Sequence, residues 1–241
     1  MGILVAQVFR EARKPPYYFG LICEQIWSIG VGSLPLVLIT ALATGSVMAL
    51  QFGYGVAKFG GKLYVPKVVA LTILREMGPV FTSLLVAGRI GSGITSEVAS
   101  MKISQQLDAM RALGTSPTRR IVTTRIIAAL ISVPLLTLFS DYVGLLGAML
   151  VCKNELGIHT SFFIAKCIET IRISDFLAGM AKTVVFAFFI ALTACWRGLE
   201  TAGGTEGVGR STTWTVVTTS IFIMISDFFL TKFLIMTGFQ V

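Results

Sequence analysis

The pattern of apolar and charged positions divides most of the chain into long apolar segments. The clearest covers residues 29 to 52, where about 24 successive residues carry no charge. At about 1.5 Å of rise per residue, a helix of this length exceeds the roughly 30 Å hydrocarbon core of a bilayer. Further apolar segments, each interrupted by one or a few charges, cover residues 66 to 95, 121 to 151, 174 to 196 and 213 to 236. The pattern predicts an all-α integral membrane protein with five transmembrane helices.

Residues 1 to 28 follow a different pattern. An apolar start precedes a group of cations at residues 10 to 14, and the pair Pro15 and Pro16 follows. A signal peptide has the reverse order, with the positive charges before the apolar part. The order predicts an N-terminal interfacial amphipathic helix that is broken at the proline pair.

Composition agrees with the membrane assignment. Hydrophobic residues make up 54% of the chain and charged residues 13%, with a mean hydropathy of +0.82. In such a chain the net charge of +8 marks one side of the membrane rather than a nucleic-acid partner. The four cysteines form no C-x-x-C pair and there is one histidine, so neither a metal site nor a disulfide framework is expected.

The distribution of Lys and Arg predicts the orientation. The N-terminal segment and the loops after the second and fourth apolar segments together carry ten of these residues, and the loops on the other side carry six. Positive loops stay in the cytoplasm, so the N terminus is expected inside and, after five spans, the C terminus outside.

Apart from Lys67 at its start, the second apolar segment carries three charges: Arg75, Glu76 and Arg89. An arginine at such depth costs about 2.5–3.5 kcal/mol on insertion scales, which suggests that the charges have a use. Neighbours on a helix point about 100° apart, so Arg75 and Glu76 need different partners. Arg75 and Arg89 return to within about 40° of one face if Pro79 leaves the helical phase intact, and such a face suits an anionic headgroup.

The alternative is that these charges form ion pairs between helices. Candidate partners are Asp141, Asp227 and Glu97. Lys182 and Asp227 are expected to pair with other helices for structural reasons. The small residues at 87 to 93 are expected to allow helices to approach closely.

The loop after the second segment predicts a short amphipathic helix. Ser104 can serve as its N-cap, Leu107, Met110 and Leu113 form an apolar stripe, and Gly114 is a stop signal. A helix of about ten residues is marginal alone, so the stripe is expected to dock onto something. Either a cytoplasmic partner protein or the protein's own helices would serve.

Several strings in one order and spacing resemble those of the MlaE/YrbE family of ABC permeases, which move lipids together with MCE-domain proteins. They are LREMGPVFTSLLVAGRIGSGITSEVASMKISQQLDAMRALGTSP, GGTEGVGRSTTWTVVTTS and SDFFLT. The resemblance covers about residues 30 to 237. It implies a permease domain at residues 29 to 237 and a homodimer in the bacterial inner membrane.

The resemblance also implies partners and a function. A cytoplasmic ABC ATPase dimer would bind ATP and Mg and drive transport of phospholipid to or from a periplasmic MCE ring. The chain itself would hold no cofactor or metal and would catalyse no reaction. The alternatives are a scaffold that anchors these partners without conducting lipid, and an intramembrane enzyme with Glu76 or Glu97 as base. The second lacks a nucleophile paired with a base.

Three groups of residues follow from this reading. The lipid-binding candidates are Arg75, Glu76, Arg89 and Glu97. The segment at about 104 to 113 resembles the coupling helix that fits a groove of the ATPase, with Ser104, Gln105, Gln106, Leu107, Asp108, Met110 and Arg111 as contacts. Gln105 departs from the family, which often has an acid there. The family pattern itself includes Gly78, Pro79, Gly88, Gly204, Gly209 and Arg210.

The last of these strings, GGTEGVGRST, also lies close to the phosphate-binding pattern G-x-x-x-x-G-K-[ST]. A working P-loop needs a preceding strand and a Lys, but here a membrane span precedes and Arg210 replaces the Lys. The glycines are expected to let a cytoplasmic loop turn, with Arg210 as an anchor at the membrane edge.

Overall fold

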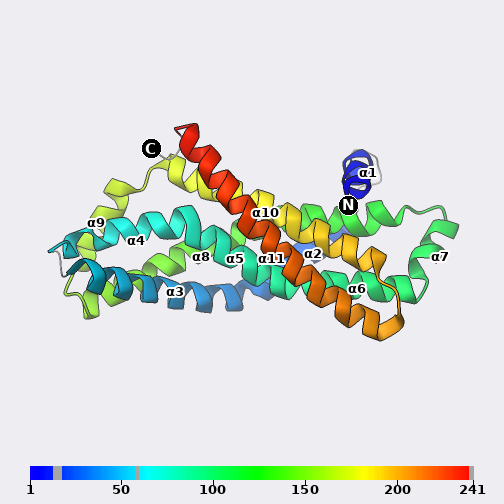
Figure 1. Ribbon diagram of the computed structural model, residues 1–241, viewed down its shortest axis with the longest axis horizontal. Helices are drawn as coiled ribbons and strands as arrows, with labels where there is room; N and C mark the ends of the chain where they lie inside the picture. Colours follow the sequence, from blue (N-terminus) through cyan, green and yellow to red (C-terminus); the bar gives the residue numbers. More distant parts are fainter. Residues whose placement is uncertain (13–17, 58–59, 239–241) are drawn as a thin grey trace. The chain divides into compact units, whose positions relative to one another are not determined.

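The computed structural model describes residues 1–12, 18–57 and 60–238, and within these ranges the chain forms helices and no strands (Figure 1). Five helical segments of the described chain are long and apolar enough to cross a membrane, which confirms the predicted fold class. They are Phe19–Val56, Lys62–Ile103, Thr118–Asn154, Ile173–Glu200 and Gly204–Met236. All five run beyond the apolar segments seen in the sequence, because their polar ends continue the helical hydrogen bonding.

The first two spans are built from several helical pieces. The first contains α2 (Phe19–Ile26), the π-helical turn η1 (Trp27–Val31) and α3 (Gly32–Ala57). The second contains η2 (Lys62–Tyr64), α4 (Val65–Thr72), η3 (Ile73–Met77), α5 (Gly78–Val86), η4 (Ala87–Gly91) and α6 (Ser92–Ile103). Of these pieces η2 is a 3-10 helix, while η3 and η4 are π-helical like η1.

The remaining elements are simpler. They are α1 (Gly2–Ala12), α7 (Gln106–Ala112), the π-helical η5 (Thr118–Thr123), α8 (Thr124–Asn154), α9 (Thr160–Thr170), α10 (Ile173–Glu200) and α11 (Gly204–Met236). The prolines inside α3 and α8, Pro35 and Pro134, do not end these helices. Prolines are tolerated in membrane helices because neighbouring groups satisfy the freed carbonyls.

The described chain divides into two compact units. The first comprises Met1–Ser33, Ser83–Val133 and Val184–Ser226, and the second comprises Leu34–Thr82, Pro134–Thr183 and Asp227–Val241. The chain passes from one unit to the other inside α3, α5, α8, α10 and α11. Each unit is described by itself below.

In the first unit, α1 packs on η5. Leu4 and Val8 of α1 are buried, whereas Gln7 and Arg10 are exposed, so the helix is amphipathic as predicted. Glu11 forms an ion pair with Arg119 of η5 at 2.6 Å. The predicted break at Pro15 and Pro16 lies outside the described residues.

The first unit is closed by contacts among α6, α10 and α11. The hydroxyl of Thr95 donates to the carbonyl of Ala194 and lies 2.9 Å from the hydroxyl of Thr215. Of the three glycines at 87 to 93, only Gly91 meets another helix at van der Waals distance, because a Cβ there would lie 3.8 Å from Thr215. Gly88 and Gly93 face open space in this chain, so the predicted close approach is wrong at these two positions.

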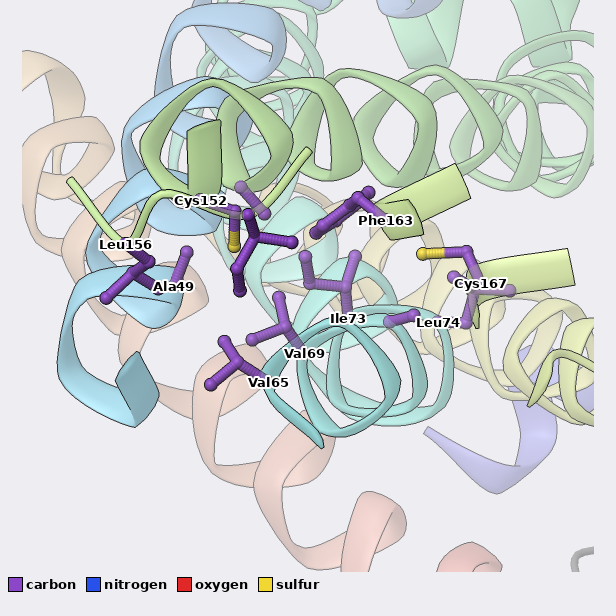
Figure 2. Close-up of a cluster of buried hydrophobic side chains, with 12 residues drawn as sticks. Ala49, Val65, Val69, Ile73, Leu74, Cys152, Leu156, Phe163 and Cys167 are labelled. Atoms are coloured by element: carbon purple, nitrogen blue, oxygen red, sulfur yellow. The ribbon is translucent and has the colours of Figure 1, made fainter. Parts of the chain in front are cut away.

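The second unit has an apolar core shared by α3, α4, η3, α8 and α9 (Figure 2). Val65, Val69 and Ile73 from the second span face Cys152 of α8 and Phe163 of α9. Between membrane helices such side chains act through close van der Waals packing, because lipid tails are as apolar as the core. This core fixes the position of η3, which carries Arg75 and Glu76.

Candidate functional site

Lys182 of α10 is the centre of a buried charged cluster in the second unit. Its side chain is 0% exposed. The ammonium nitrogen lies 2.7 Å from Glu76 Oε2, 3.1 Å from Asp227 Oδ1, 2.7 Å from Thr231 Oγ1 and 3.1 Å from the carbonyl oxygen of Arg75. One lysine therefore joins η3, α10 and α11, and this confirms the expectation that Lys182 and Asp227 serve as structural partners.

Arg75 forms its ion pair with another residue, Asp175 of α10. Its Nη2 and Nε lie 2.6 Å and 2.8 Å from Asp175 Oδ1, and the backbone N–H of Arg172 donates to the other oxygen of Asp175 at 3.1 Å. As predicted, Arg75 and Glu76 have separate partners. We call Arg75, Glu76, Asp175, Lys182 and Asp227 the Lys182 cluster.

The cluster is open on one side. The side chains of Asp175 and Lys182 are 1% and 0% exposed, whereas those of Arg75 and Glu76 are 27% and 31% exposed. The cluster also holds three carboxyl groups for two cations. An opening with exposed Arg75 and Glu76 atoms, on helices that are otherwise apolar, can receive a polar group from a ligand.

The four lipid-binding candidates are divided between the units. Arg75 and Glu76 lie in the Lys182 cluster of the second unit. In the first unit, Arg89 donates to Ser33 at 2.7 Å, and Glu97 pairs with Arg125 at 2.7 Å. The predicted common face of Arg75 and Arg89 assumed one helical phase, and the π-turns η3 and η4 that carry these two arginines do not keep that phase.

Asp141 does not pair with the charges of the second span. It is buried, and its Oδ1 lies against Gly78 with no hydrogen-bond partner among the described residues. Gly78, in the REMGP part of the first string shared with the family, thus leaves room for a buried carboxyl group.

The predicted short helix exists as α7, but its cap differs. The N-cap is Gln105, which has a left-handed φ of 57° and makes no side-chain cap hydrogen bond. Ser104 instead donates back to the carbonyl of Ser100 at 2.8 Å, so its prediction as N-cap is wrong. The stop at Gly114 is confirmed: its φ is +73°, and Thr115 N–H donates to the carbonyl of Met110.

Helix α7 has one buried face and one exposed face. Leu107 is 3% exposed and Met110 is half-buried, so part of the apolar stripe packs on the chain itself. Leu113 is 83% exposed, and Asp108 and Arg111 form an exposed ion pair at 2.8 Å. The remaining coupling candidates, Ser104, Gln105 and Gln106, are exposed too.

The string GGTEGVGRST is mostly helical, because it forms the start of α11. Gly203 and Gly204 have φ values of +89° and +67° and make the turn. Gly209 and Arg210 lie inside α11, so the expectation of a longer loop is wrong. Helix α10 precedes the turn, and a P-loop would need a strand there.

The sequence did not reveal that Asp175 and Arg125 are the ion-pair partners of Arg75 and Glu97. Asp175 falls at the predicted start of the fourth span, where water would solvate a carboxylate, so the cost of burial gave no signal. No group of three His, Cys, Asp or Glu in the described parts of the chain is placed to hold a metal ion. The four cysteines, all within these parts, are free thiols.

Comparison with known proteins gives one consistent family. The family described as "Permease MlaE" matches residues 22–233. A probable ABC transporter permease protein of Rickettsia typhi is 39% identical over 92% of this chain and 85% of its own. A probable ABC transporter permease protein of Synechocystis is 36% identical over 86% and 79%. The chloroplastic protein TRIGALACTOSYLDIACYLGLYCEROL 1 of Arabidopsis thaliana is 33% identical over 96% of this chain and 66% of its own.

Proposed function

The chain belongs to the MlaE permease family and is the permease subunit of an ABC transporter, and we propose that it moves phospholipid. The observation that carries the proposal is the Lys182 cluster, in which partly exposed Arg75 and Glu76 lie within an apolar span. The name of the Arabidopsis relative contains a galactolipid, trigalactosyldiacylglycerol, which is also a glycerolipid. A membrane-embedded guanidinium beside apolar walls suits a ligand with a phosphate and acyl chains.

Transport would use two states of the permease. A separate ABC ATPase would bind ATP and Mg, and its closure would move the helices between a state that holds lipid and one that releases it. Arg75 would contact the lipid phosphate through the part of its guanidinium that Asp175 leaves open. Asp175 and Lys182 would hold Arg75 and Glu76 in position.

The proposed partners and location follow the same reading. The chain would form a homodimer in the bacterial inner membrane, with its N terminus in the cytoplasm and its C terminus in the periplasm. An MCE-domain ring would meet it on the periplasmic side, and the ATPase on the cytoplasmic side. Support for the ATPase contact comes from α7, where Leu107 anchors the helix while Asp108, Arg111 and Leu113 stay exposed.

The ion pairs of Lys182 with Glu76 and Asp227 favour one alternative function, that of a scaffold. If these charges only hold helices together, the chain could be a scaffold that anchors the ATPase and the MCE protein. The two functions differ in what conservative changes at the open side of the cluster should do.

The test is lipid transport by the chain co-purified with its ATPase and reconstituted in vesicles. Arg75→Lys keeps a cation beside Asp175, and Glu76→Gln keeps hydrogen bonding to Lys182, so both variants should fold. Because a hydrogen bond to a charged group contributes about 1.5–3 kcal/mol, each variant should lower transport and bound phospholipid at least about tenfold.

The matched control is Lys166→Gln, which removes one partner of the exposed Lys166–Glu169 pair outside the five spans. Transport should be unchanged in this variant. Normal transport in both Arg75→Lys and Glu76→Gln, with normal ATPase assembly, would show that the cluster is only structural.

A further inference from the structure

A second polar site lies in the first unit, apart from the Lys182 cluster. An open hollow of about 520 Å³ is lined by α2, α6, α7, η5 and the start of α8. These elements include the first residues of the first and third spans and the last residues of the second. Span ends lie at the depth of the lipid headgroups, so the hollow lies in the interfacial layer.

The charges of this hollow are balanced and incompletely paired. Glu24, Glu97, Arg120 and Arg125 line it. Glu97 pairs with Arg125, but in the described part of the chain Glu24 and Arg120 have no ion-pair partner, and Arg120 lies 5.9 Å from the Tyr18 ring centroid. Arg125 is 4% exposed, and its Nε has no hydrogen-bond partner among the described residues.

This arrangement selects for the charge of a ligand. A ligand with only negative charge would meet Glu24 and Glu97, and a ligand with only positive charge would meet Arg120 and Arg125. A ligand that carries both signs a few ångströms apart can pair with both. The hollow therefore fits a zwitterion better than a simple anion or cation.

The shape adds an apolar requirement. Leu21, Met101 and Leu113 also line the hollow, and methionine adapts to irregular apolar ligands. A second hollow of about 360 Å³ shares Glu24, Gln25 and Glu97 with the first and is lined further by Ser28, Ile29, Ile90, Gly93 and Ile94. The pair of hollows suits an elongated amphiphile with its polar end at the charges.

We propose that the paired hollows bind one zwitterionic phospholipid, with its phosphate at Arg120 and Arg125 and its ammonium at Glu24 and Glu97. The proposal rests on the proposed function in that both have the chain bind phospholipid, and it adds a headgroup class. The site uses residues of the first unit only. Its occupancy can therefore be measured independently of the Lys182 cluster.

The experiment measures lipid binding to the full-length chain in detergent by native mass spectrometry. Synthetic phosphatidylethanolamine, which is zwitterionic, competes with phosphatidylglycerol, which is anionic and has the same acyl chains. Pairs between exposed charges are weak, so phosphatidylethanolamine should be favoured about 1.4- to fivefold. Free phosphorylethanolamine at the same concentration should not displace it, because the acyl chains contribute to binding.

Two variants address the two parts of the site. Glu24→Gln should reduce the preference for phosphatidylethanolamine, because it removes an attraction for the ammonium group and a repulsion of the anionic headgroup of phosphatidylglycerol. Gly93→Leu should lower binding of both lipids, because Gly93 lines the second hollow and faces open space. The matched controls are Glu155→Gln and Gly55→Leu, exposed positions outside both hollows, and they should behave as the wild type.

Three results would overturn the proposal: equal binding of the two lipids by the wild type, an unchanged preference in Glu24→Gln, or displacement by free phosphorylethanolamine. Loss of the lipid on adding the ATPase, with protection of Arg120 from chemical modification, would assign the hollow to a protein partner instead. Failure of transport in vesicles would contradict the proposed function but not the measured preference. The two proposals are therefore tested separately.

Discussion

At the scale of single residues, Gly78 leaves the least room for a side chain among the glycines of the second unit, because Asp141 lies against it. A Cβ at Gly78 would overlap the buried Oδ1 of Asp141 and lie 2.8 Å from its Cγ. Glycine inside a helix ordinarily costs about 0.8–1.0 kcal/mol relative to alanine. Here the helix keeps a glycine because the buried carboxyl group occupies the space that a side chain would need.

Gly78→Ala should therefore destabilise the protein despite its better helix propensity. Overpacking typically costs about 1–3 kcal/mol, which exceeds the gain in propensity. Thermal unfolding in detergent, followed by circular dichroism, should show a lower Tm. Gly88→Ala is the control, because Gly88 faces open space and its Tm should stay equal or rise. A Tm for Gly78→Ala that is no lower than that of Gly88→Ala would contradict the packing argument.

At the scale of elements, α9 is a short helix whose attachment can be measured. Phe163 and Cys167 bury its inner face in the core of the second unit, and the Cys167 thiol lies 4.0 Å from the carbonyl oxygen of Pro66 in α4. Burial, with a smaller contribution from Cys152, raises the pKa of the Cys167 thiol from 9.0 to about 11. Cys23 of α2 is exposed.

Maleimide at pH 7 should label Cys23 rapidly and Cys167 very slowly. The raised pKa alone lowers the thiolate fraction of Cys167 about a hundredfold, and burial blocks the reagent in addition. Mass spectrometry of peptides should find modified Cys167 only after denaturation, when all four thiols react. Rapid labelling of Cys167 in a Cys23→Ser protein would mean that α9 opens readily from α4.

At the scale of the whole molecule, α11 leaves a long apolar face uncovered. Within the first unit, Thr215, Thr219 and Ile223 are buried, whereas Trp214, Val217, Ile221 and Met224 are 44–56% exposed. The exposed residues recur at alternating intervals of three and four, which is the spacing of a helix–helix seam. We expect a second copy of the chain to cover this face in the proposed homodimer.

Cysteine cross-linking in membranes can test this arrangement. In a Cys23→Ser background, Val217→Cys and Ile221→Cys should each give a disulfide-linked dimer on mild oxidation. Leu150→Cys in α8 is the control, because Leu150 is 51% exposed on another span and should face lipid. Equal cross-linking at Leu150, or none at Val217 and Ile221, would exclude α11 from the interface.

The sequence predicts much of this architecture for clear physical reasons. Apolar length determines the five spans, and the cost of buried charge shows that Arg75, Glu76 and Lys182 need partners. The same reasoning fails for Asp175, whose position at a span end hides its burial. It also fails for the π-turns and for the cap at Gln105, because apolar periodicity predicts neither a π-turn nor a left-handed residue other than glycine.

The Lys182 cluster also has a consequence for how the protein is made. Ribosomes produce the chain from its N terminus, so Glu76 reaches the membrane before Lys182, and Lys182 before Asp227. Inserting the fourth span places a lysine in the bilayer at a cost of about 2.5–3.5 kcal/mol, and pairing with Glu76 of the already inserted second span can offset part of it. Asp227 then enters beside a cation that is already in place. The order of the charges along the gene thus lets Lys182 and then Asp227 each meet a counterion that is already in the membrane.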